Sequence, residues 1–483
     1  MPAIRGWISL AFAILLLLPA TKAHAQFETA SVLGYVRDTS GAVIPNTAVT
    51  LTNNATSITQ TSTTDGEGKY EFASVPIGEY HVDAQATGFD RSQTQTFRVT
   101  TNARQRVDVE MKAGSVSDTV TISSAPTLLE TETSSRGQVI GTREIENLPL
   151  NGRSYADLVL LAPGVRKSAL EDQTTTNREA SFNVNGQRSA FNNFLLDGLD
   201  NNSYGTSNQG FANENIPPSP DAVSEFRLET NNYSAEYGRA SGAVINASIR
   251  RGTNQFHGRV WDYLRNTNLN AIGPFAPPGN VKPTFIRNQF GGTIGGPIWH
   301  DHTFFFADYE GTRQIAKQFA AATLPNAEQR SGVFLLHRLD GTSAPIPIQN
   351  PVTGVVYANG VIPAADQTAF AKAVLANLPA LTTAAPLSTA AAFSNNYSNF
   401  PRGTIQDDKG DIRLDHTFGP RLSVFGRYSD HEAAIFAPPT FGGRAGGNAN
   451  ANVNILNRQV AAGVTYVITP TSLLDVRIGH WEE

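Results

Sequence analysis

Acidic side chains and histidines are the groups in this sequence whose spacing could support chemistry. The stretch from Phe182 to Thr206 reads FNVNGQRSAFNNFLLDGLDNNSYGT and places Asp197 and Asp200 close together among asparagines. Two nearby carboxylates could hold a cation or act as a general acid and base. Asp-Gly is also a common turn sequence, and the apolar residues directly before Asp197 are typical of a short strand. We therefore interpret Asp197 as a turn former that ends a strand.

Other candidate groups also have simpler structural interpretations. The tripeptide HDH at 300–302 could supply metal ligands, but it lies between GGP at 295–297 and an aromatic run, which is typical of a hairpin turn. The acid pairs at 407–408 and 482–483 have no recognisable cleft for glycosidase chemistry. The sequence has no H-E-x-x-H, G-x-S-x-G, P-loop or dinucleotide-binding motif. We therefore predict no catalytic residue, no metal site, no cofactor and no enzyme activity.

The composition favours strands and turns over long soluble helices. Of the 483 residues only 16% are charged, while Gly occurs 41 times and Phe 26 times. The absence of cysteine excludes disulfide bridges, zinc–thiolate sites and cysteine nucleophiles. A net charge of −5 gives no sign of nucleic-acid binding, and we expect no nucleic-acid partner.

Residues 1–25 have the features of a secretory signal peptide. Arg5 precedes an apolar run, and Ala23 and Ala25 form a small-x-small cleavage site. The alternative is a buried N-terminal helix. No later segment has 18 consecutive apolar residues, so a membrane form of the mature protein would have to be a β-barrel.

Residues 26–112 are predicted to form a β-sandwich. Short alternating runs recur about every 8 to 12 residues between turn sequences such as DTSG at 38–41. The runs GYVRDTSGAVIP, TTDGEGKYEF and GEYHV resemble the carboxypeptidase regulatory-like domain. That resemblance implies an accessory module without catalytic residues. Residues 113–140, which are rich in Ser and Thr, are predicted to be a linker.

Residues 251–483 show the alternation of strands that have one polar face and one apolar face. Ile412 and Leu414 have one parity, and Asp411 and Arg413 have the other. A transmembrane barrel with lipid outside and water inside gives this pattern, and so does a soluble sheet with one wet face. The signal peptide, the missing cysteines and the long polar insertions favour the barrel.

Aromatic residues near the start of this region predict a girdle at the membrane–water interface. The alternative is a soluble core cluster. The predicted girdle residues are Trp261, Tyr263, Phe304, Phe305, Phe306 and Tyr309.

Three segments of residues 146–250 carry a second resemblance. They are ENLPLNGRSYADLVLLAPGV, FNVNGQRSAFNNFLLDGLDNN and PPSPDAVSEFRLETNNYSAEYGRASGAVINASIRRGTNQFHG. These segments resemble the plug of TonB-dependent outer-membrane receptors, and NQFGGTIGGPIWHDHTFFFADYEGTR resembles an early barrel hairpin. Sandwich, plug and barrel in this order resemble the Oar-like branch of the family. The resemblance implies a mainly β fold with an N-terminal β-sandwich, a mixed α/β plug at residues 141–250 and a partial transmembrane β-barrel at residues 251–483.

The sequence departs from the family in two respects. Residues 231–233 are NNY where many receptors have Arg-Gly-Pro, so siderophore-specific detail is not carried over. The stretch after residue 250 is too short for a plugged barrel of about 22 strands at roughly 10 residues each, and it lacks a terminal aromatic residue. We therefore expect a fragment or a truncated gene product.

The resemblance implies a transporter in the outer membrane of a Gram-negative cell. It would import or export a large solute, such as an oligosaccharide, a siderophore or a peptide. Its partners would be the outer-membrane lipid and a TonB-type energising protein of the inner membrane. An alternative is an adhesion or carbohydrate-binding surface protein without transport, and a third hypothesis is a secreted hydrolase with an accessory sandwich.

Two sets of residues are candidate contacts. The segment SDTVTIS at 117–123 resembles a TonB box, which binds its partner by strand addition, although an ordinary linker strand explains it too. Its predicted partner-binding residues are Asp118, Thr119, Val120, Thr121 and Ile122. The polar plug loop after Asp200 is predicted to face the ligand, through Asn201, Asn202, Ser203 and Tyr204.

Overall fold

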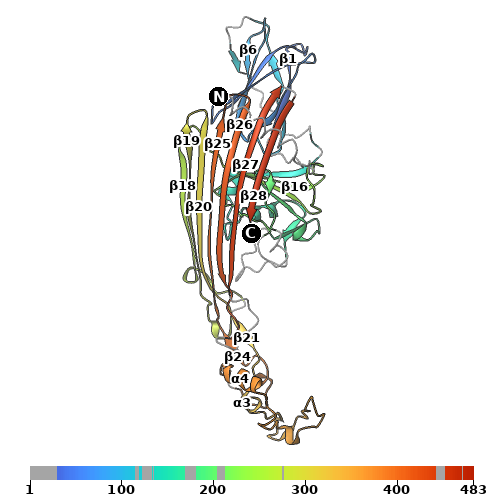
Figure 1. The fold of residues 1–483 in the computed structure, drawn as a ribbon, viewed down its shortest axis with the longest axis vertical. Helices are drawn as coiled ribbons and strands as arrows, with labels where there is room; N and C mark the ends of the chain where they lie inside the picture. Colours follow the sequence, from blue (N-terminus) through green and yellow to red (C-terminus); the bar gives the residue numbers. More distant parts are fainter. Residues whose placement is uncertain are drawn as a thin grey trace, which may run out of the picture.

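The computed structural model describes residues 30–114, 119–121, 133, 135–168, 181–203, 213–274, 277–383, 385–441, 452–469 and 472–483. The chain runs from an N-terminal sandwich into a central domain at the position of the predicted plug, and then into a sheet of long strands (Figure 1). We call the second part the plug and the third part the wall. The predicted signal peptide lies outside the described residues.

The sandwich consists of two sheets packed around one apolar core. One sheet has the order β4-β1-β8 with β9 beside β1, and the other has the order β10-β6-β5-β2-β3 with β7 beside β5. Val32, Leu51, Tyr70 and Val82 are among the buried core residues. The strands are β1 (Ala30–Asp38), β2 (Ala48–Asn53), β3 (Thr59–Thr63), β4 (Lys69–Val75), β5 (Gly78–Gln85), β6 (Arg91–Gln93), β7 (Phe97–Val99), β8 (Arg104–Arg106), β9 (Val109–Met111) and β10 (Thr119–Thr121).

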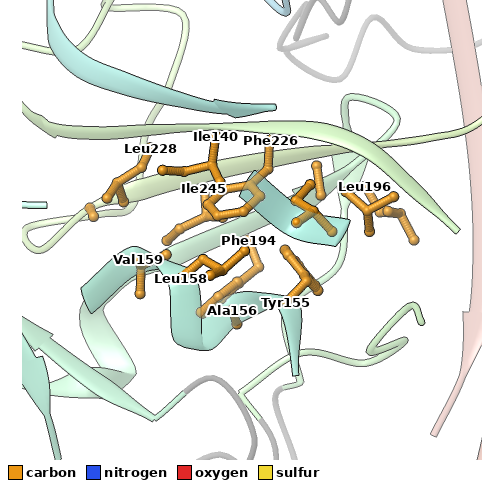
Figure 2. Close-up of a cluster of buried hydrophobic side chains, with 14 of the residues drawn as sticks. Ile140, Tyr155, Ala156, Leu158, Val159, Phe194, Leu196, Phe226, Leu228 and Ile245 are labelled. Atoms are coloured by element: carbon orange, nitrogen blue, oxygen red, sulfur yellow. The ribbon is translucent and has the colours of Figure 1, made fainter. Parts of the chain in front are cut away.

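The plug is built on a five-stranded mixed sheet with the order β11-β16-β17-β14-β15. The 3-10 helix η1 covers one face of this sheet, and the ring of Tyr155 meets the ring of Phe226 edge-on at 5.3 Å between centroids (Figure 2). The predicted mixed α/β character is present, although the helices are short. The elements are β11 (Arg136–Gly141), α2 (Thr142–Asn147), η1 (Tyr155–Leu161), β12 (Val165–Lys167), β13 (Phe182–Val184), η2 (Ser189–Phe191), β14 (Asn193–Leu196), β15 (Leu199–Asp200), β16 (Val223–Asn231) and β17 (Val244–Ile249).

The wall is an antiparallel sheet in which each long strand pairs with the next one in the order β18-β19-β20-β25-β26-β27-β28. Its strands have 10 to 17 residues, which is enough to cross a bilayer at a tilt. Within the described residues the sheet does not close into a barrel. The strands are β18 (His257–Asn266), β19 (Phe285–Trp299), β20 (Thr303–Lys317), β25 (Arg402–Thr417), β26 (Leu422–Phe436), β27 (Val453–Thr469) and β28 (Ser472–Glu482).

The two faces of the wall have the predicted polarity. Ile412 and Leu414 are 55% and 48% exposed on the outer face, whereas Asp411 and Arg413 are buried on the inner face. This arrangement confirms strands with an apolar outer face and a polar inner face. Other exposed apolar residues of the outer face are Val460, Val464, Leu474, Val476 and Ile478.

The predicted aromatic girdle is wrong for four of its six members. Phe304 and Phe306 point inward and are 3% and 1% exposed, because the even-numbered residues of β20 face the plug. The rings of Trp261 and Tyr263 lie 4.8 and 4.9 Å from the guanidinium of Arg153 in the plug. Residue parity along each strand therefore decides which aromatic side chains can reach lipid.

A lobe of residues 318–401 separates β20 from β25 and lies beyond the end of the wall that is far from the sandwich (Figure 1). The turns at 300–302 and 418–421 lie at the sandwich end and are short. Outer-membrane barrels have short periplasmic turns and longer outer loops, so the sandwich end corresponds to the periplasmic end of such a barrel. No helix in the described ranges is long and apolar enough to cross a membrane. The elements of the lobe are β21 (Ala320–Ala322), α3 (Ala327–Arg330), β22 (Leu335–His337), β23 (Ser343–Pro345), η6 (Ala358–Gly360), α4 (Ala369–Asn377), η7 (Ala390–Ala392) and β24 (Tyr397–Asn399).

Candidate functional site

Asp197 occupies the turn between β14 and β15 of the plug. The backbone φ is 52° at Asp197 and 73° at Gly198, and Leu196 pairs with Leu199 across the turn. The predicted turn is therefore confirmed. The structure adds a second role, because the Asp197 side chain is completely buried between the plug and the wall.

The carboxylate of Asp197 joins the plug to two strands of the wall. Its Oδ1 lies 2.7 Å from Nη1 of Arg413 on β25, and its Oδ2 lies 2.7 Å from Nε of Arg427 on β26. The backbone N–H of Ile249 also donates to Oδ1, at 3.0 Å. Arg477 on β28 donates to the Asp197 carbonyl oxygen at 2.7 Å. One plug turn therefore holds three wall strands.

The arginines that meet Asp197 are themselves fixed within the wall. Arg413 donates to both carboxylate oxygens of Asp415, at 3.0 and 3.1 Å, and Arg427 donates to Oε1 of Gln459 at 2.6 Å. Neither arginine is exposed. Removing one partner from a buried ion pair costs about 3–5 kcal/mol, so these contacts oppose any movement of the plug away from the wall.

A second buried ion-pair cluster centres on Arg153. Its Nη2 lies 2.5 Å from Oδ2 of Asp221 within the plug, and its Nε lies 2.7 Å from Oε2 of Glu310 on β20. Ser219 donates to the same Glu310 oxygen at 2.9 Å. Arg259 on β18 approaches Oδ1 of Asp221 at 2.8 Å. The plug is thus held to the first wall strands as well as to the later ones.

The sandwich contacts the plug through a further buried carboxylate. Glu225 on β16 accepts hydrogen bonds from the backbone N–H and the hydroxyl of Thr101, at 2.5 and 2.9 Å, and from Arg98 at 3.0 Å. Asn102 contacts the hydroxyl of Tyr237 beside it. Burial raises the pKa of Tyr237, and neighbouring glutamates add to this effect, so the hydroxyl stays protonated. These contacts fix the sandwich against the plug.

Replacing Glu225 with alanine is expected to loosen this junction. The change removes the acceptor for the buried Thr101 N–H, and the free energy that holds the two domains together falls by about 1–3 kcal/mol. Amide hydrogen exchange of residues 97–103 should then accelerate about tenfold or more. Glu110→Ala, on the exposed side of β9, is the matched control. Equal rates of amide hydrogen exchange in the two variants would show that Glu225 does not hold the sandwich against the plug.

The predicted ligand-facing residues lie in a buried position. Asn201 exchanges two hydrogen bonds with the backbone of Ile216, at 2.8 and 3.0 Å, and the Phe194 N–H donates to Oδ1 of Asn202 at 3.0 Å. Ser203 is also buried, and Tyr204 lies outside the described residues. These side chains brace the plug turn, and their contact with a solute stays a prediction.

Part of the candidate TonB box forms a strand on the sandwich. Thr119, Val120 and Thr121 make up β10, which pairs in parallel with β6 in the register Thr119 to Arg91. Asp118 and Ile122 lie outside the described residues. The backbone of this segment is therefore already engaged in strand pairing.

The remaining candidate groups do not assemble a reactive site. Residues 300–302 form the turn between β19 and β20, where the His302 ring stacks on Trp299 at 4.3 Å. Asp407 is buried beside His431 on the inner face, while Asp408 pairs with Arg313, 2.8 Å away. In the part of the chain that the structure describes, no group of three or more acidic or histidine side chains could hold a metal ion.

Sequence reasoning missed the ion-pair residues, which are Arg153, Glu225, Glu310, Arg413 and Arg427. The signal that could have found them is the row of charged residues on the inner parity of β20, β25 and β26. Charges on a face that packs against protein must find partners there.

Comparison with protein families agrees with these three parts. Residues 31–112 match the carboxypeptidase regulatory-like domain, residues 130–244 match the TonB-dependent receptor plug domain, and residues 248–482 match an outer membrane beta barrel domain. The chain belongs to the TonB-dependent receptors. Their plug is the domain that Asp197 and Arg153 hold against the wall. The family consists of transporters and receptors rather than enzymes, and it resides in the outer membrane.

Individual proteins are also similar to parts of this chain. The chain is 28% identical over 307 residues to the TonB-dependent transporter Oar of Myxococcus xanthus, an alignment that covers 61% of this chain and 27% of that protein. Similar solved structures include the outer membrane transporter YddB from Escherichia coli, at 13% identity and a TM-score of 0.44 over 71% of this chain and 38% of that one. Another is the ferric enterobactin receptor PfeA from Pseudomonas aeruginosa, at 13% identity and a TM-score of 0.37 over 68% and 38% of the two chains.

Proposed function

We propose that this chain is part of a transporter that moves a large solute across the outer membrane. The observation that carries the proposal is the plug, which is fixed to the inner face of the wall by buried ion pairs at Asp197 and Arg153. A domain held in this way closes a pore at rest. Transport requires energy, because the ion pairs must separate before a solute can pass.

The energy would come from a TonB-type protein of the inner membrane. In this proposal residues 117–123 add as a strand to an edge of that partner. Because β10 already pairs with β6, the segment must leave the sandwich before it can bind. Residues 1–25 would direct export to the periplasm as a signal peptide.

A binding experiment tests this function. The purified chain in detergent micelles is titrated with the periplasmic domain of the TonB-type protein from the same cell. We expect deletion of residues 117–123 to weaken binding at least about tenfold, because the pairing strand is lost. Deletion of residues 124–130, a stretch of equal length in the same linker, is the control. The proposal fails if both deletions bind as well as the intact chain does.

The alternative of an adhesion or carbohydrate-binding protein without transport is not favoured. A plug that is fixed inside a barrel wall serves to close a pore, and surface adhesion does not require one. The proposed solute is an oligosaccharide, a siderophore or a peptide, moved by import or export.

A further inference from the structure

A cavity of about 310 Å³ lies between the plug and the first two wall strands. The plug contributes the end of α2, the loop at 148–153 and Asp221, and the wall contributes residues of β18 and β19. The wall residues Arg265 and Arg287 lie near the lobe end of these strands, far from the sandwich. A solute that arrives from outside would therefore reach this cavity before it passed the plug.

Two arginines from neighbouring strands converge in this cavity. Arg265 and Arg287 are directly opposite each other in the sheet register. Each points one Nη1 at the same acceptor, the side-chain oxygen of Asn151, at 3.2 and 3.4 Å. Both guanidinium groups lie over the ring of Phe285, at 4.5 and 5.2 Å from its centroid. The plug therefore offers a neutral amide oxygen where the wall presents two fixed positive charges.

The acidic residues of the cavity are already neutralised by other arginines. Glu146 lies 2.5 Å from Arg250, and Asp221 lies between Arg153 and Arg259. Among the described residues, the polar and ring contacts of Arg265 are to Asn151 and Phe285, and neither carries a negative charge. The wall of the cavity thus has an excess of positive charge at Arg265.

We propose that Arg265 and Arg287 form a binding site for an oxyanion, a carboxylate or phosphate group, of the solute. Guanidinium groups hold such anions through paired, charge-assisted hydrogen bonds, which are roughly twice as strong as hydrogen bonds to a neutral amide. The anion replaces the Asn151 oxygen between the two arginines. Phe285 lies against both guanidinium groups, and Nε of Arg287 donates to Oε1 of Gln314 at 2.6 Å, so the two arginines are held in position. This inference rests on the proposed function and names the chemical class of its solute.

Displacement of Asn151 also links solute binding to the plug. The next residue, Gly152, accepts a hydrogen bond from Gln289 on β19 at 3.0 Å, and Arg153 follows with its ion pairs to Asp221 and Glu310. When the anion releases Asn151, the loop loses its outermost contact with the wall. The loop is then held to the wall by the contacts of Gln289 and Arg153 without that of Asn151. An occupied anion site therefore weakens the attachment of the plug on that side.

The site is tested by binding to the purified intact chain, which requires no energising protein. Citrate is the probe for a soluble polycarboxylate, and purified lipopolysaccharide is the probe for a membrane phosphate. We expect the double variant Arg265→Ala/Arg287→Ala to weaken binding of the accepted probe about tenfold or more. Arg313→Ala is the control, because Arg313 on β20 is paired with Asp408 on β25 and does not line the cavity.

The two probes separate the sources of the anion. Saturable binding of citrate that the double variant loses supports a soluble solute, and the same result with lipopolysaccharide supports a lipid phosphate. Equal affinity of the native chain and the double variant for both probes overturns the site. Asn151→Ala should bind the accepted probe more tightly, because the competing amide is gone, and weaker binding would contradict the displacement. Loss of binding to the TonB-type protein would leave these results unchanged, so the two proposals fail separately.

Discussion

Replacing Asp197 with alanine is expected to lower the free energy of unfolding by about 5 kcal/mol, at the upper end of the range for a broken buried ion pair. The change leaves Arg413 and Arg427 buried without the carboxylate that each contacts at 2.7 Å. It also removes the acceptor of the Ile249 N–H. Urea titration of the protein in detergent micelles, followed through tryptophan fluorescence, measures the loss. We expect the plug to separate from the wall first.

Two further variants make the Asp197 experiment decisive. Asp430→Ala is the matched control, since the ion pair of Asp430 with Arg458 is exposed and is worth at most about 1 kcal/mol. Asp197→Asn keeps the shape of the side chain and one acceptor, so its free energy of unfolding should lie between those of the native chain and Asp197→Ala. The plug–wall contact is not the main attachment if Asp197→Ala is no less stable than Asp430→Ala.

Replacing Glu310 with alanine is expected to lower the free energy of unfolding by about 3 kcal/mol, near the lower end of the range for a broken buried ion pair. Arg153 loses one of its two carboxylate partners but retains Asp221, which limits the cost. Ser219 loses its acceptor at the same time. The loss is measured by urea titration, and protease cleavage of the plug loop at 148–153 should become faster.

Glu432, on the outer face of β26, is the matched control for Glu310. Glu432→Ala makes the same chemical change outside the contact between plug and wall, so it should change the free energy of unfolding by no more than about 0.5 kcal/mol. Faster cleavage in Glu310→Ala alone would show that the Arg153 cluster holds this loop. Identical cleavage of the two variants would contradict that role.

The architecture of this protein was largely readable in its sequence. Side chains alternate along a strand with a period of two, so the apolar parity of Ile412 and Leu414 predicted the outer face of the wall correctly. The turn at Asp197 was readable as well, because Asp-Gly favours the left-handed backbone that the structure shows. These properties are local, and a short window of residues contains all that they require.

The contacts between the parts could not be read in this way. Asp197 and Arg427 are 230 residues apart, and nothing in the local pattern says which inward charge of the wall meets which residue of the plug. Strand register and the packing of the plug set those pairs, and they turned a predicted turn residue into the link between the domains. The same reason explains Phe304 and Phe306, which sequence placed at the membrane surface and the fold places against the plug. The chemistry of a side chain determines which kind of environment it prefers. The tertiary fold determines which residue it then contacts.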